Sequence, residues 1–168
     1  LVSQIDHPHQ SVKDTSGRDP YFFGFGDGLN TFSRSPFSGF TRVMWTDCNG
    51  YFDAASDCLA PKGFTQARHT LAPGVEVDVY NLHAEAGGGV ADVAARQSTL
   101  RQLYAFIEAN SAGRAVIVMG DTNSRYTRAD DILPELVSAV GLTDVWVERV
   151  RGGVAPGIGA SLTAGCAA

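Results

Sequence analysis

The chain has 168 residues, of which 44% are hydrophobic and 18% are charged, and 13 Lys and Arg against 18 Asp and Glu give a formal net charge of −5. This composition is typical of a globular domain, and a chain of this length buries about 70% of its unfolded surface, which is enough for one core. The longest fully apolar run, residues 115–119, is far shorter than the roughly 18 residues of a membrane-spanning helix, and no stretch is rich in Lys and Arg. A disordered tail and a membrane-spanning chain are therefore excluded, and a protein that binds nucleic acid by charge alone is disfavoured.

Short strands and turns are predicted in the first half of the chain. Residues 1–20 are polar and indicate loop, and short strands are expected at 29–33 and 40–45. Residues 64–71 and 75–82 flank an Ala-Pro-Gly turn, which predicts a β-hairpin. In the second arm of this hairpin, we expect the odd-numbered side chains from position 75 to position 79 to face the core, and Tyr80 and Leu82 break this alternation near the end of the strand.

Helices and strands are both predicted in the second half. Apolar residues recur at helical spacing over 91–110, and Arg96 is expected among the polar residues on the opposite face of that helix. The continuous apolar run 115–119 predicts a strand that is buried on both faces. A short helix is expected at 131–140 and a further strand at 142–150. This mixture indicates an α+β fold or a layered α/β sandwich.

The domain organisation is predicted to be simple. The sequence contains no internal repeat, and no linker precedes the Gly-rich tail. We therefore expect residues 1–168 to form one domain, with a Gly/Ala-rich loop at 152–168.

The three cysteines bear on the compartment of the protein. Cys48 and Cys58 lie ten residues apart in a segment rich in Gly, Asn, Asp and Ser, which indicates a loop. A disulfide is favoured, with two free thiols and a metal pair as the alternatives. The metal pair is the least favoured, because the loop has neither Cys-x2-Cys spacing nor a His. Such a disulfide is typical of secreted proteins, so we expect an extracellular location. Cys166 is left over, and a partner beyond residue 168 is one option for it.

Polar side chains follow two of the predicted strands at the points where these strands end. Asn81 and His83 are two residues apart and therefore lie on one face, and Asp121 and Asn123 follow the buried strand in the same way. An imidazole, a carboxylate and carboxamides in this arrangement can orient a water molecule, donate a proton and bind a phosphoryl oxygen. Because a single His is often structural and Gly-Asp-x-Asn is a common turn, the residues alone leave a hydrolytic site and a structural role both open.

Four motifs in order resemble the endonuclease/exonuclease/phosphatase superfamily. They cover about residues 26–146 and comprise a strand ending in Asn-x-His, a strand ending in Gly-Asp-x-Asn, an upstream Gly-x4-Ser-Arg-x-Pro strand and a downstream helix followed by Leu-x-Asp. In this sequence they read Val77-Asp-Val-Tyr-Asn-Leu-His83, Val116-Ile-Val-Met-Gly-Asp-Thr-Asn123, Gly28-Leu-Asn-Thr-Phe-Ser-Arg-Ser-Pro36 and Leu136-Val-Ser-Ala-Val-Gly-Leu-Thr-Asp-Val-Trp146. The resemblance is closest to secreted fungal and bacterial members, and it implies the deoxyribonuclease-I-like four-layer α/β sandwich.

The resemblance also implies an activity, namely metal-assisted hydrolysis of a phosphoester, usually with Mg²⁺ and otherwise with a cation such as Ca²⁺ or Mn²⁺. Asp121 would orient or activate the attacking water and contact the metal, and Asn123 would bind a phosphoryl oxygen and also contact the metal. His83 would stabilise the phosphoryl group or assist the leaving oxygen. Asn81 would be a supporting donor, with a simple strand-ending role as its alternative.

The sequence departs from the family pattern at both ends. The N-terminal strands that carry an Asn and a metal-binding Glu, and the last strand with its Ser-Asp-His motif, have no clear counterpart among the 168 residues. We therefore interpret the chain as a central fragment of the sandwich, and we expect little or no hydrolysis by these residues alone.

Two functional hypotheses follow. The first is a secreted metal-dependent phosphoesterase whose substrate is nucleic acid, a phospholipid such as sphingomyelin, or a small phosphate ester; the net charge of −5 mildly disfavours DNA. The second is a non-catalytic or degenerate sandwich that serves as a structural or interaction component and packs against flanking strands or other chains of an assembly.

Overall fold

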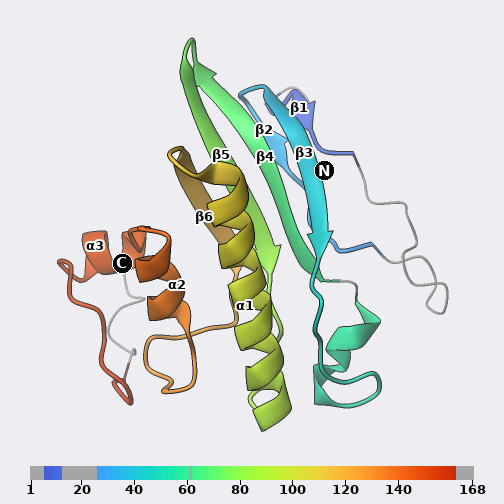
Figure 1. Cartoon of the computed structure of the whole chain (residues 1–168), viewed down its shortest axis with the longest axis vertical. Coiled ribbons are helices and arrows are strands. Elements are labelled where there is room, and N and C mark those ends of the chain that lie inside the picture. Colours follow the sequence, from blue (N-terminus) through green and yellow to red (C-terminus); the bar gives the residue numbers. More distant parts are fainter. Residues whose placement is uncertain (1–5, 13–25, 61, 162–168) are drawn as a thin grey trace.

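The computed structural model describes residues 6–12, 26–60 and 62–161 (Figure 1). The described part leaves out residues 1–5, 13–25, 61 and 162–168, and Cys166 is therefore outside it. In chain order the elements are β1 (His9–Gln10), β2 (Phe32–Ser33), β3 (Phe37–Met44), the 3₁₀ helix η1 (Ala54–Leu59), β4 (Gly63–Ala72), β5 (Val75–His83), α1 (Val90–Ser111), β6 (Ala115–Asp121), α2 (Leu133–Ala139) and α3 (Val145–Val150).

Four of the strands form one mixed sheet, in the order β3-β4-β5-β6. The first three strands are antiparallel, and β6 runs parallel to β5 because α1 carries the chain back across the sheet between them. The long helix α1 lies along one face of this sheet (Figure 1). On the other face, Ser33 at the end of β2 contacts the ring of His69 on β4, with 3.2 Å between Oγ and Nδ1. The predicted α+β class is confirmed.

The predicted hairpin is confirmed, with β4 and β5 joined by Pro73 and Gly74. The expectation that the odd-numbered side chains 75–79 face the core is wrong, because the core lies on the opposite face of the strand. There, Tyr80 and Leu82, which break the alternation, pack under α1 and are 0% and 1% exposed. The alternating Val side chains lie on the other face, and only Val77 among them is fully buried. As a result, Asn81 and His83 face away from α1.

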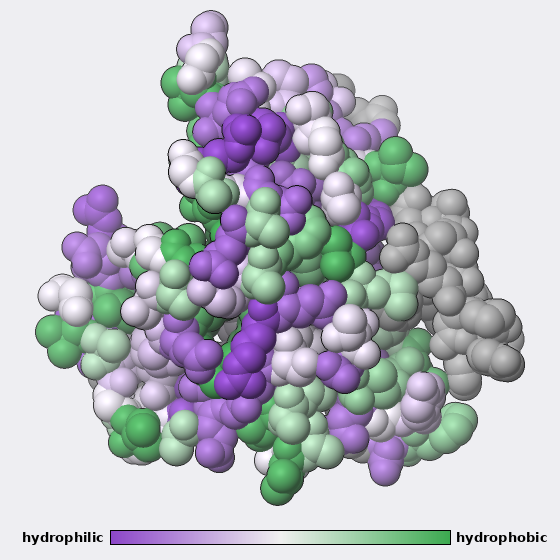
Figure 2. Space-filling model, viewed as in Figure 1, coloured by the Kyte–Doolittle hydropathy of each residue, from purple (hydrophilic) through white to green (hydrophobic). Residues whose placement is uncertain are grey.

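One hydrophobic core lies between the sheet and α1. Its buried members come from β4, β5, the segment after β5, α1 and α2: Phe64, Tyr80, Leu82, Ala84, Leu100, Leu103, Ile107 and Leu136. Trp45 stacks near Phe64 with 5.2 Å between ring centroids, and its indole nitrogen donates to the carbonyl of His83 at 2.8 Å. The core therefore fixes the backbone at the point where β5 ends. Figure 2 shows hydrophilic side chains over the middle of the molecule, where α1 turns its outer face to the viewer.

Three predicted strands differ from the structure. The strand expected at 29–33 is reduced to β2, and the strand expected at 40–45 begins earlier, at Phe37. The strand expected at 142–150 is wrong, because this segment forms α3 after the Asp144 side chain caps the helix by accepting from the backbone N–H of Val147 at 3.0 Å.

The predicted burial of β6 on both faces is also wrong. Ile117 and Met119 are 48% and 47% exposed, whereas Val116 and Val118 pack against the core. The reason is that the core lies on the Val116 and Val118 side of β6, and the opposite side is only partly covered by the described residues. No helix among the described residues is long and apolar enough to cross a membrane.

Candidate active site

His83 and Asp121 meet because they end neighbouring parallel strands in the same register. The ladder between β5 and β6 pairs His83 with Asp121, and paired residues point to the same face of a sheet. His83 Nε2 lies 3.9 Å from Asp121 Oδ2, and their side chains are 41% and 64% exposed. Asn81, paired with Met119, lies one step back on the same face and is half-buried. An imidazole and a carboxylate therefore stand together, open to solvent, at one end of the sheet.

Gly120 allows β6 to approach β5 this closely. Its φ is +125°, a conformation that L side chains rarely adopt, and a Cβ added there would lie 2.1 Å from the carbonyl oxygen of Leu82. The glycine of the Gly-Asp-x-Asn motif is thus a steric requirement for the placement of Asp121.

Asn123 folds back over both strand ends. Its backbone N–H donates to Asp121 Oδ1 at 2.9 Å, and its side-chain amide donates to the carbonyl of Ala84, directly after His83, at 3.1 Å. The backbone adopts φ +49°, a left-handed conformation that Asn tolerates better than most residues. The structure therefore brings together three of the four predicted residues in direct contact, with Asn81 alongside on β5.

The oxygen atoms of Asp121 and Asn123 are of the type that Mg²⁺ prefers. No three His, Cys, Asp or Glu side chains are grouped as metal ligands among the described residues. Mg²⁺ is commonly held by one or two carboxylates, with waters and substrate phosphate completing its octahedral shell. An exposed carboxylate beside a carboxamide fits such a sparse protein contribution.

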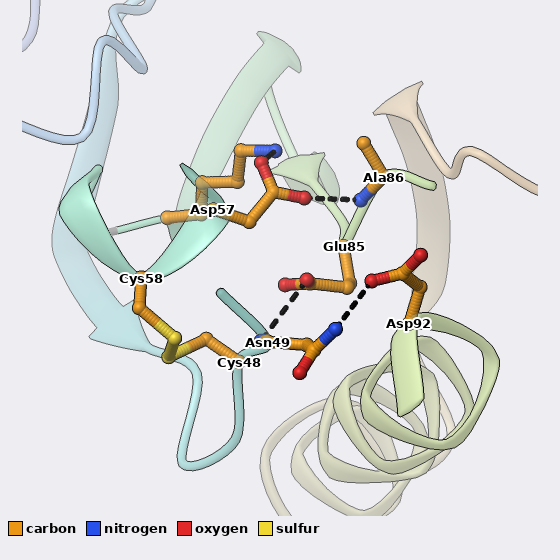
Figure 3. The surroundings of a disulfide bond; sticks show 8 residues. Cys48, Asn49, Asp57, Cys58, Glu85, Ala86 and Asp92 are labelled. Carbon is orange, nitrogen blue, oxygen red and sulfur yellow. Dashed lines mark hydrogen bonds and ion pairs between the residues drawn. A yellow bond between two sulfur atoms is a disulfide. The ribbon is translucent and has the colours of Figure 1, made fainter. Parts of the chain in front are cut away.

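The loop between Cys48 and Cys58 is closed by a disulfide, so the predicted bridge is confirmed over free thiols and a metal pair. Two side chains of this loop reach the chain after β5, one at the first turn of α1 and the other at the segment between β5 and α1 (Figure 3). The amide of Asn49 donates to Asp92 Oδ1 at 2.6 Å, and Asp57 Oδ2 accepts from the backbone N–H of Ala86 at 2.6 Å. The disulfide loop thereby braces the connection between β5 and α1.

Glu85 lies between the disulfide loop and the segment that joins β5 to α1, and it was not identified from the sequence. It is 1% exposed and accepts a hydrogen bond from the backbone N–H of Asn49 at 3.0 Å. Burial raises the pKa of the Glu85 carboxyl to about 7, and the nearby charge of Asp57 adds to the rise against the opposing effect of the Asn49 N–H. Asp57 itself forms an ion pair with Lys62.

Arg96 is buried, which corrects its predicted place on the outer face of the helix. The residue is only 1% exposed because its guanidinium pairs with the carboxylate of Asp131, at 2.9 Å between Nη2 and Oδ1. The sequence held a signal for this, since Arg96 precedes the core residues Leu100 and Leu103 by four and seven positions and so shares their face.

Comparisons with known proteins show similarity in sequence and in fold. A sphingomyelinase of Mycobacterium tuberculosis is 41% identical over 132 residues, which cover 79% of this chain and 25% of that protein. Among solved structures, sphingomyelinase C from Streptomyces griseocarneus matches with a TM-score of 0.65 at 21% identity, over 84% of this chain and 51% of that one. Beta toxin from Staphylococcus aureus with bound magnesium ions matches with a TM-score of 0.65 at 17% identity, over 84% and 51% of the two chains.

An endonuclease/exonuclease/phosphatase from Beutenbergia cavernae also matches, with a TM-score of 0.53 at 20% identity over 70% of this chain and 31% of that one. No family model matches the sequence. The chain spans a quarter of the length of the sphingomyelinases that it matches and about half of the sphingomyelinase C and beta toxin structures. These likenesses confirm the resemblance inferred from the motifs: the chain has the deoxyribonuclease-I-like fold of the endonuclease/exonuclease/phosphatase superfamily.

Proposed function

We propose that this chain supplies part of the catalytic centre of a secreted, metal-dependent phosphodiesterase that acts on a phospholipid. The observation that carries the proposal is the His83–Asp121 pair, held in register at two strand ends with Asn123 folded over it. The sphingomyelinase relatives favour a phospholipid over nucleic acid or a small phosphate ester. The disulfide in the 48–58 loop supports an extracellular location.

The side chains suit the hydrolysis of a phosphodiester. The exposed carboxylate of Asp121 orients a water molecule and accepts its proton as the water oxygen attacks phosphorus. His83 donates a hydrogen bond to a phosphoryl oxygen or a proton to the leaving oxygen, while the carboxamides of Asn123 and Asn81 stabilise the negative charge that develops. Mg²⁺ bound by Asp121 and Asn123 would supply charge stabilisation and a more acidic water.

The direct test is the hydrolysis of sphingomyelin in vesicles by the longest natural polypeptide that contains this sequence, with Mg²⁺ and with a chelator. We expect turnover that the chelator removes, and a loss of at least about 100-fold in kcat for His83→Ala and Asp121→Ala, as is usual for proton-transfer groups. Arg101→Ala is the matched control, because Arg101 is 53% exposed and its ion-pair partner among the described residues is Glu135, at the surface.

Unchanged rates for both site variants would contradict the assignment of the site. Duplex DNA and p-nitrophenyl phosphate, assayed in parallel, separate the other substrate classes. Vesicle binding without turnover of any of the three substrates would favour the non-catalytic alternative. We further predict that the 168 residues alone turn over slowly or not at all, and metal-dependent hydrolysis by them at the rate of the longer polypeptide would contradict this.

A further inference from the structure

We infer that Arg96 and Asp131 are positioning residues that hold the two catalytic strand ends at their working separation. This inference rests on the proposed function, because it concerns the residues to which the hydrolysis is assigned. Neither side chain reaches the exposed face where His83 and Asp121 meet, so both act through the backbone of the loops that follow the two strands.

Arg96 binds the loop that follows β5. From the second turn of α1, its Nη1 donates to the carbonyl of Gly87 at 2.9 Å and to that of Glu85 at 3.4 Å. The first of these carbonyls lies four residues after His83 and the second only two residues after it. A buried guanidinium is costly unless its donors are used, and here they fix the path of the chain from β5 into α1.

Asp131 lies in the loop that follows β6 and bonds to other residues of that loop as well as to Arg96. Its Oδ1 accepts from Arg96 Nε at 3.1 Å and Nη2 at 2.9 Å, while its Oδ2 accepts from the backbone N–H of Arg125 at 2.8 Å. The same Oδ2 lies 2.6 Å from Nε of Arg128. Both partner side chains of the Arg96–Asp131 pair are almost fully enclosed, at 2% and 1% exposed.

Arg128 extends this network to the site itself. Its Nη2 donates to the backbone carbonyl of Asn123, the residue whose side chain bonds to Ala84. A closed circuit results, in which the loop after His83 and the loop after Asp121 are joined once through Asn123 and once through the Arg96–Asp131 pair. Two independent links between the loops constrain their separation more tightly than either link alone.

A second ion pair, with a buried carboxylate and an arginine side chain that is 29% exposed, provides the control. Arg68 on β4 and Asp78 on β5 form two hydrogen bonds, at 2.8 and 3.1 Å, and the Asp78 side chain is 1% exposed. Asp78 also accepts from Ser111 at the end of α1. This pair lies nearer the hairpin, five residues before His83 on the same strand, and bonds to neither of the catalytic loops. It therefore reports what the loss of an ion pair does to the fold alone.

Replacing Arg96 with Lys keeps the charge and removes the planar fork that serves Asp131 and two carbonyls at once. In vesicle hydrolysis by the longest natural polypeptide, we expect Arg96→Lys and Asp131→Asn to lower kcat about 10- to 100-fold, the size of effect that small misplacements of reacting groups produce. KM should change less than about threefold, since neither residue touches the substrate. Arg68→Lys should leave kcat within about twofold, and added guanidinium should partly restore kcat to Arg96→Ala.

Equal losses of kcat in Arg96→Lys and Arg68→Lys at matched stability in urea, or a wild-type kcat in Arg96→Lys, would overturn the inference. A readout that needs no activity keeps it separate from the proposed function. In ¹H–¹⁵N spectra of the folded chain, Arg96→Lys and Asp131→Asn should shift the amide resonances of Asn123 and Ala84, and Arg68→Lys should leave them in place. If the wild-type protein hydrolyses nothing, the proposed function fails, and unshifted Asn123 and Ala84 resonances would then reject the positioning role as well.

Discussion

The two ends of the four-stranded sheet differ in how their charged side chains are paired and exposed. Near the hairpin, the charges of Arg68 and Asp78 neutralise each other in place. At the other end, the buried pair Arg96–Asp131 lies behind the strand ends, and the groups in front of it, His83 and Asp121, are left 41% and 64% exposed. A buried charge needs its partner, because the loss of either partner leaves an uncompensated charge, whereas a charge that is exposed on a rigid support remains available to a substrate.

Glycine substitutions should separate the two ends most strongly. Gly74 in the hairpin turn has φ +77° with nothing within 4 Å of an added Cβ, whereas Gly120 has φ +125° and a Cβ there would strike the backbone of Leu82. We expect Gly120→Ala to lower the free energy of unfolding by about 3 kcal/mol or more, and Gly74→Ala by about 1 kcal/mol. Urea unfolding of both variants measures this. Equal losses would show that β6 does not need its close approach to β5.

Removal of the disulfide should have the next largest effect. The Cys48–Cys58 bridge closes a loop of about ten residues, and loop-closure entropy predicts a loss of about 3 kcal/mol for the Cys48→Ser, Cys58→Ser double variant. Because Asn49 and Asp57 would also be less restrained, hydrogen exchange should accelerate at Ala86, whose N–H bonds to Asp57. Unchanged exchange at Ala86 would contradict a bracing role for the loop.

Glu85 should make stability depend on pH. Its pKa is about 7 in the folded protein against 4.5 ordinarily, so between these values the folded state binds more protons than the unfolded state. The contribution of Glu85 is therefore fully present below pH 4.5 and is lost as the pH rises through 7, by up to about 3 kcal/mol. Glu85→Gln mimics the protonated carboxyl, so its stability relative to wild type should increase from pH 4.5 to pH 8. A relative stability that stays constant over this range would contradict the raised pKa.

A surface ion pair should matter least. Arg101 and Glu135 lie 3.6 Å apart, and both side chains are more than half exposed. Solvent screens such pairs, so Arg101→Ala should change the free energy of unfolding by less than about 0.5 kcal/mol. A loss of unfolding free energy as large as that of the Cys48→Ser, Cys58→Ser variant would mean that exposed ion pairs contribute to the stability of this protein as much as its disulfide does.

The sequence predicted the hairpin and α1 well because their patterns are long and regular. The site residues His83, Asp121 and Asn123 were found through their motifs, and the register of β5 with β6 explains why residues 38 positions apart meet. Their catalytic roles remain proposals.

Features that depend on distant partners were not predictable in the same way. Arg96 and Glu85 are buried only because Asp131 and Asn49 come to them from other parts of the chain. The segment expected as a strand at 142–150 becomes a helix because Asp144 caps it, an effect of one side chain that apolar periodicity does not record.

The most direct test of the central claim compares Asp121→Asn with Arg101→Ala in the hydrolysis of sphingomyelin vesicles at saturating Mg²⁺, using the longest natural polypeptide that contains this sequence. Asp121→Asn keeps the size of the side chain and removes its charge. The account predicts that kcat falls at least about 100-fold in Asp121→Asn and stays within about twofold of wild type in Arg101→Ala. Equal kcat values in the two variants would contradict the assignment of catalysis to the paired strand ends of β5 and β6.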